Sequence, residues 1–127
     1  MANSLELVER DMNVDGLELL DEAIAEAIRD DDIRRVRTLC HHAASVSRFN
    51  GDWVSVKRYY EQSLACDPEN ARALYGLAAV ALHEGDPVTA RQYATRCYTS
   101  ILCSDDEILK LGLLDLIVKN WPELVEK

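Results

Sequence analysis

Apolar and polar residues recur along this chain at helical spacing. Leu17, Leu20, Ile24 and Ile28 fall on one stripe of a helix, and acidic residues occupy the opposite face. Comparable stripes follow, separated by breaks that contain Asp, Gly or Pro. The pattern predicts helices over residues 17–29, 33–49, 53–66, 71–84, 87–102 and 105–119, and one more turn over 123–127. Residues 1–15 have no helical period, so we expect no helix there.

A longer period of 34 residues relates these helices to one another. Gly51-Asp52 recurs as Gly85-Asp86, and Tyr59 recurs as Tyr93. The same spacing relates core positions, namely Cys40, Leu74 and Ile108, and small residues, namely Ala44, Ala78 and Gly112. A fixed period with a Gly-Asp turn is typical of stacked helix–turn–helix units, which leave a concave surface. The predicted fold class is all-α, a solenoid of about six helices in antiparallel pairs, with close helix approaches at the small residues Ala44, Ala78, Ala90 and Gly112.

These residues resemble the tetratricopeptide repeat family. Residues 37–70 form one unit, 71–104 a second, and 105–127 a partial third. Leu74 with Leu77-Ala78 fits the pattern of the family's first helix, and Ile108 with Leu111-Gly112 fits it as well. The second unit ends in Leu102, where the family usually has proline. The resemblance implies a repeat domain over residues 33–127, preceded by an acidic segment, residues 1–32, whose helix caps the array or mediates dimerisation.

The resemblance also implies where a partner would bind. In this family the first helix of each unit lines the concave surface. The implied lining residues are His41, His42, Ser45, Phe49, Tyr75, Ala79, Leu82, His83, Leu109, Lys110, Leu113 and Leu116. Some relatives clamp an acidic tail with Lys, Asn and Arg, but the matching positions here hold His41, Ser45, Gly76, Asp106 and Lys110. We therefore expect a protein or peptide partner with hydrophobic anchors.

Two functions remain open at this point. The first is a module that binds a peptide segment of a partner, as a secretion-type chaperone or adaptor. The translocator chaperones of bacterial type III secretion are similar in size, acidity and architecture, although they carry a fuller third repeat. The alternative is a scaffold, docking or self-assembly module of a larger complex or a longer enzyme, with no chemistry of its own.

The net negative charge of the chain comes from residues 1–32. Residues 1–32 carry eleven acids and two arginines, whereas residues 33–127 carry twelve acids and twelve bases. This acidity disfavours nucleic acid as a partner, because phosphates would be repelled. The acidic segment either attracts a basic partner or is a solvated face. No signal peptide or long apolar run is apparent, so we expect a cytoplasmic protein without membrane insertion.

Candidate chemistry is sparse. Four cysteines form no CxxC pair, which favours reduced thiols. Cys40, His41, His42 and His83 suggest a metal site, but adjacent histidines point about 100° apart on a helix. No catalytic or phosphate-binding motif is present. We expect no cofactor, no metal and no enzyme activity.

Residues 108–118 are apolar around nearly the whole helix. A helix that ends a solenoid should have a polar outer face, so something is expected to cover this one. The candidates are Trp121–Leu124 folding back, a second copy, a client, or further sequence. We expect fold-back together with self-association, which predicts a homodimer.

Overall fold

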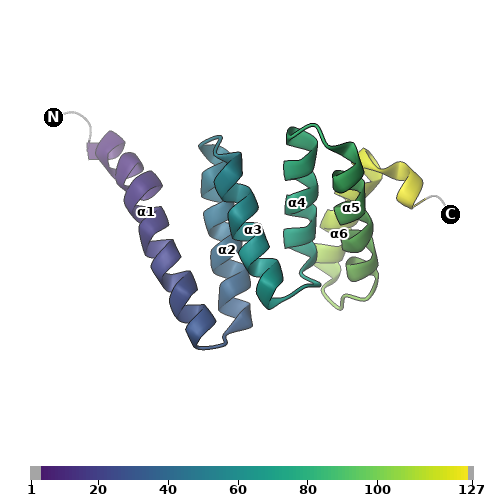
Figure 1. The fold of residues 1–127 in the computed structure, drawn as a ribbon, viewed down its shortest axis with the longest axis horizontal. Helices are drawn as coiled ribbons and strands as arrows, with labels where there is room; N and C mark the ends of the chain where they lie inside the picture. The colour runs from purple at the N-terminus through teal and green to yellow at the C-terminus, as the bar shows by residue number, and fades with distance from the viewer. Residues whose placement is uncertain (1–3, 126–127) are drawn as a thin grey trace.

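The chain folds into a row of packed helices in the computed structural model, which describes residues 4–125, with side chains from residue 16 onward. Figure 1 shows this row, with α1 at one end and the C-terminal turn η1 at the other. The elements are α1 (Ser4–Arg29), α2 (Ile33–Phe49), α3 (Trp53–Cys66), α4 (Ala71–His83), α5 (Pro87–Leu102), α6 (Glu107–Asn120) and η1 (Pro122–Leu124). Within residues 4–125 there is no strand, so the predicted all-α helical solenoid is confirmed.

Local sequence signals set the helix boundaries. Each helix from α2 to α6 begins after an Asp or Asn whose side chain accepts a backbone N–H three residues further on. Gly51 and Gly85 end α2 and α4 with φ values of 74° and 78°, which side-chain-bearing residues rarely adopt. The Gly51 N–H donates to the Arg48 carbonyl, and the Gly85 N–H donates to the Leu82 carbonyl. The predicted Gly-Asp turns are confirmed.

Helix α1 is longer than the sequence pattern predicted. It begins at Ser4, so the expectation that residues 1–15 contain no helix is wrong for residues 4–15. Residues 5–12 are mostly Leu, Glu, Arg and Met, which favour helix, and Leu5, Val8 and Met12 stand at helical spacing. Gly16 inside the helix costs only about 1 kcal/mol.

Two apolar clusters form the core and meet at α4. Eight of the 13 residues of α4 are buried, which makes it the central helix. Its Leu77 and Val80 pack with α1, α2 and α3, whereas Leu74 and Ala78 pack with α5 and α6. Ala44, Ala78 and Ala90 are at most 1% exposed, as expected for residues at close helix approaches.

The last helix is only partly covered within a single chain. Ile108, Leu111 and Val118 are 86%, 63% and 44% exposed. Trp121 folds back and is buried in the second cluster, but it leaves this side of α6 open. Gly112 is wrong as a close-approach site, because a Cβ there would meet nothing within 4 Å. The reason is that no second helix of a third unit packs there among the described residues.

The four cysteines are free thiols, as predicted. Cys40 and Cys97 are buried, and desolvation raises their pKa values to about 11 and about 12. A thiol with such a pKa stays protonated at neutral pH and packs as a small apolar residue. None of the described helices has the length and apolarity needed to cross a membrane.

Candidate functional site

Six of the twelve predicted lining residues surround one cavity of about 220 Å³ between α2, α3, α4 and α6. We call it the apolar cavity. The six are His41, Ser45, Tyr75, Ala79, Leu113 and Leu116. Ala44, Arg48, Trp53, Val56, Tyr60, Arg72 and Gly76 complete the lining. Leu113 is buried, so it contributes to the wall of the cavity through a side chain that also belongs to the second core cluster.

Tyr60 and Gly76 shape one side of the apolar cavity. A Cβ at position 76 would overlap the Tyr60 ring, so the ring occupies the space that a side chain on α4 would fill. The Tyr60 hydroxyl lies 3.1 Å from Nδ1 of His41, which links α3 to α2. Burial raises the pKa of Tyr60, so its hydroxyl keeps a proton for this hydrogen bond at neutral pH.

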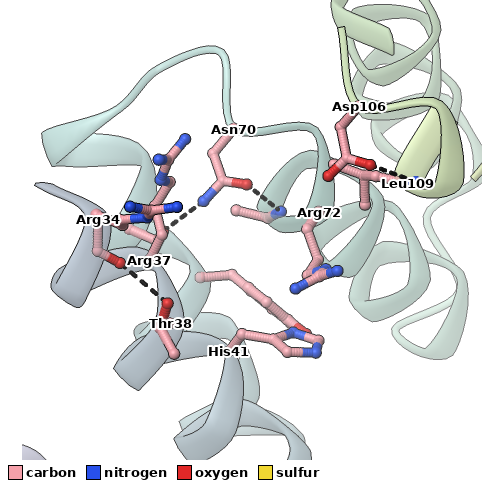
Figure 2. A pocket seen from close by; sticks show the side chains of 11 residues that line it. Arg34, Arg37, Thr38, His41, Asn70, Arg72, Asp106 and Leu109 are labelled. Carbon is pink, nitrogen blue, oxygen red and sulfur yellow. Dashed lines mark hydrogen bonds between the residues drawn. The ribbon is translucent and has the colours of Figure 1, made fainter. Parts of the chain in front are cut away.

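A second cavity of about 260 Å³ adjoins the first, and we call it the polar cavity. The two share His41, Tyr60 and Arg72. The other lining residues of the polar cavity are Arg34, Arg37, Thr38, Ser63, Asn70, Ala73, Asp106 and Leu109. Figure 2 shows the Arg72 and His41 side chains pointing toward one another across it, with Arg34 and Arg37 on one side and Asp106 on the other.

The polar cavity carries an excess of positive charge. Arg37 pairs with Asp67 at 3.2 Å, but among the side chains described from residue 16 onward, Arg34 and Arg72 have no carboxylate within 4.0 Å. The single carboxylate in the lining, Asp106, accepts the Leu109 N–H at 3.1 Å as the cap of α6. Two guanidinium groups are thus left without an anionic partner in this part of the structure.

The partial burial and positive surroundings of His41 lower its pKa. Burial lowers its pKa, and the positive charges of Arg72 and His42 lower it further. The imidazole is therefore neutral at neutral pH. In this form one ring nitrogen donates a hydrogen bond and the other accepts one.

Other predicted lining residues lie outside both cavities. Phe49 is 87% exposed, and His42 and Leu82 are also exposed. His83 stacks on Trp53 with the ring centroids 4.4 Å apart, so it supports a wall of the apolar cavity from outside. Lys110 lines neither cavity, whereas Leu109 lines the polar one.

The basic side of the site was not predicted from the sequence. Arg34 and Arg37 lie in the first turns of α2, outside the positions at which the family's clamp residues occur. A usable signal was present, because Arg34-Arg35-Val36-Arg37 follows the acidic run Asp30-Asp31-Asp32 with only Ile33 between them. Among the described residues, no group of three or more His, Cys, Asp or Glu side chains is placed to hold a metal ion.

The comparison with protein families agrees with the geometry. The model of the tetratricopeptide repeat matches residues 59–92, from the second half of α3 through α4 into α5. The match identifies residues 59–92 as a tetratricopeptide repeat and supports the tetratricopeptide repeat superfamily for the chain. The matched residues include Tyr60, Arg72, Tyr75 and Gly76 of the two cavities. No curated protein matches the chain. Tetratricopeptide repeats form a non-catalytic protein-interaction fold, so the matched repeat indicates a protein–protein interaction module.

Proposed function

We propose that this tetratricopeptide repeat protein binds a peptide segment of a partner protein on the surface formed by α2, α4 and α6, with an apolar side chain of the peptide in the apolar cavity. The observation that carries this proposal is the convergence of Tyr75, Ala79 and Leu116 with residues of α2 and α3 around one opening. These residues are only partly buried, so they offer apolar surface that a ligand can still cover.

The size of the apolar cavity supports a peptide anchor. Sites for whole small molecules usually have volumes of about 300–1,000 Å³. A cavity of about 220 Å³ is smaller and suits a single side chain. Trp53, Tyr60 and Tyr75 supply flat rings in its wall, which favour contact with aliphatic or aromatic side chains.

The finer form of the proposal is a chaperone or adaptor that holds an apolar segment of its client. The size, the acidic first segment and the helical repeats support it. The division into an acidic segment, residues 1–32, and a repeat domain, residues 33–127, is part of this proposal. Copurification of a client that competes with peptides for the apolar cavity would establish the chaperone or adaptor role.

Peptide selection tests the proposal without a known client. A random 12-residue library displayed on phage is selected on the wild-type protein, and an enriched peptide is synthesised. Ala79→Glu places a charge inside the apolar cavity and should weaken binding of that peptide at least about tenfold. Val88→Glu, on the exposed surface of α5, is the matched control and should bind normally. Unchanged affinity in a folded Ala79→Glu variant would contradict the proposal, as would a selection that enriches nothing.

We also propose self-association through α6. Ile108, Leu111 and Val118 lie on one exposed side of this helix, where the 34-residue period would place the second helix of a third unit. A second copy offers the same apolar stripe, and two identical stripes can meet about a twofold axis. This second candidate corresponds to a self-assembly module, and its test is given in the Discussion.

A further inference from the structure

We propose that the polar cavity binds the carboxylate of an Asp or Glu side chain in the same peptide, at an internal position flanked by apolar residues. This inference rests on the proposed function, because its ligand is the peptide that enters the apolar cavity. It adds a charge requirement that an apolar binding surface alone would not impose.

Three arginines from two helices line the polar cavity. Arg34 and Arg37 are three residues apart on α2, so they project from the same side of that helix, and Arg72 enters from the first turn of α4. All three are exposed at the cavity, and their guanidinium groups can each donate two parallel hydrogen bonds to one carboxylate. The anion would lie between two helices instead of on one flat face.

Basic side chains outnumber acidic ones around the polar cavity. Arg34 and Arg72 lack a carboxylate within 4.0 Å among the described side chains, and Arg37 has only the partly exposed pair with Asp67. Asp106 is the one acid in the lining and already caps α6. Figure 2 shows Asp106 across the cavity from Arg34 and Arg37. A bound carboxylate can therefore contact these two arginines at a distance from the Asp106 carboxylate. The local field favours an anion although the chain has a net charge of −9.

Apolar surface adjoins the arginines in two neighbouring cavities. The polar cavity shares His41, Tyr60 and Arg72 with the apolar cavity. It shares Arg72, Asp106 and Leu109 with a further depression of about 370 Å³, whose lining includes Ile108 and Leu113. These two neighbours also share Arg72 and Leu113 with each other. A peptide that places its acid at the arginines and continues into both neighbours therefore carries apolar residues on both sides of the acid.

The test uses the phage-displayed library of random 12-residue peptides on the full-length protein. Wild-type selections should enrich Asp or Glu flanked by apolar residues. A synthetic peptide from the selection, with its C-terminus amidated, is then compared with its Glu→Gln or Asp→Asn form by fluorescence anisotropy. The neutral form should bind roughly ten- to hundredfold more weakly, because it loses charge-assisted hydrogen bonds. The amidated end ensures that only the side-chain carboxylate is measured.

Arginine variants connect this preference to the cavity. Arg34→Ala combined with Arg72→Ala should remove most of the difference between the acidic and neutral peptides. Arg35→Ala removes a positive charge from the same helix outside the cavity lining and should preserve the difference. Circular dichroism establishes that each variant is folded, and the residues changed are all exposed.

The outcomes separate this inference from the proposed function. Enrichment of apolar peptides without an acid, or equal affinity for the acidic and neutral forms, would overturn the inference and leave the apolar anchor intact. Enrichment of nothing would remove both. If the arginine variants instead abolish self-association and the peptides do not compete with it, acidic residues of a second copy fill the cavity and the inference is wrong.

Discussion

The Tyr60 ring lies against Gly76 so closely that a Cβ at position 76 would overlap it. Gly76→Ala should therefore displace the ring and destabilise the protein by about 1–3 kcal/mol, even though alanine favours helix by about 1 kcal/mol. Urea denaturation monitored by circular dichroism measures the change. Peptide binding should weaken as well, because Tyr60 lines both cavities.

Gly112 provides the matched control for this substitution. It also lies within a helix, but a Cβ there would meet nothing within 4 Å. Gly112→Ala should therefore stabilise the protein by up to about 1 kcal/mol through helix propensity alone. Equal effects of the two substitutions would show that Tyr60 moves aside without cost.

The sequence predicts the surroundings of small residues in these helices only in part. The 34-residue period related Gly112 to Ala44 and Ala78, and its prediction of a close helix approach holds for the two alanines. It fails for Gly112 because burial depends on which helix packs next, and a local pattern carries no information about a missing neighbour. Caps and turns were predictable, since Asp52 and Gly51 act on residues within four positions.

The candidate site likewise contains residues that the sequence predicts and residues that it does not. Tyr75, Ala79 and Leu116 follow from the repeat frame, because each repeat presents its first helix to the concave side. The meeting of Arg34 with Arg72 depends on how α2 and α4 are placed, which joins residues 38 positions apart. Spacing within one helix cannot show such a juxtaposition.

A hydrogen bond ties α1 to the rest of the array. The Tyr59 hydroxyl donates to Oδ1 of Asp21 at 2.7 Å, and burial together with this bond raises the pKa of Tyr59 to about 12. Tyr59→Phe should cost about 1–2 kcal/mol, with hydrogen exchange rising first in α1. Val54→Ala, at an exposed position of α3, should leave the exchange of α1 unchanged.

Acid should destabilise the fold through its helix caps. Asp52 accepts hydrogen bonds from the Ser55 hydroxyl and backbone N–H, and these bonds hold its pKa below the ordinary value. Asp86 has the same arrangement with Thr89. A lowered folded-state pKa gives stability that is complete above the unfolded value near about 4 and is lost as the pH falls below it. Urea titrations from pH 6 down to about pH 3 should show this loss, reduced in an Asp52→Asn and Asp86→Asn double variant.

Peptide binding should tighten as the pH falls from about 7 toward about 6. His41 has a lowered pKa, and a carboxylate beside Arg72 would raise it, so the complex takes up a proton that the free protein does not hold. The charged or titratable groups around His41 are Tyr60 from α3, Arg72 and Tyr75 from α4, Asp106 before α6, and Arg34, Arg37, His42 and Arg48 from α2. Histidine NMR titrations with and without peptide measure the shift. The neutral peptide should leave the His41 pKa unchanged, and a pH-independent affinity for the acidic peptide would contradict the prediction.

Self-association should depend on the open side of α6. Ile108 and Leu111 are among the most exposed apolar residues of the described chain, and they are adjacent on the helix surface. Covering them removes apolar area from water, which favours a dimer at micromolar concentration. Sedimentation velocity over a concentration series should show a monomer–dimer equilibrium for the wild type. Ile108→Glu with Leu111→Glu should shift it to monomer, whereas Val54→Glu, an equally exposed apolar residue on α3, should not.

Salt distinguishes the apolar contact from a charged one. An interface built on Ile108, Leu111 and Val118 should persist in about 1 M NaCl, because apolar burial is not screened. Contacts made by the eleven acids of residues 1–32 would weaken under the same conditions, since the Debye length falls to about 3 Å. A dimer lost in salt but unaffected by Ile108→Glu with Leu111→Glu would place the interface in the acidic segment. A monomer at every concentration would mean that the open side of α6 does not join two copies, and the chain would act as a monomeric peptide-binding module.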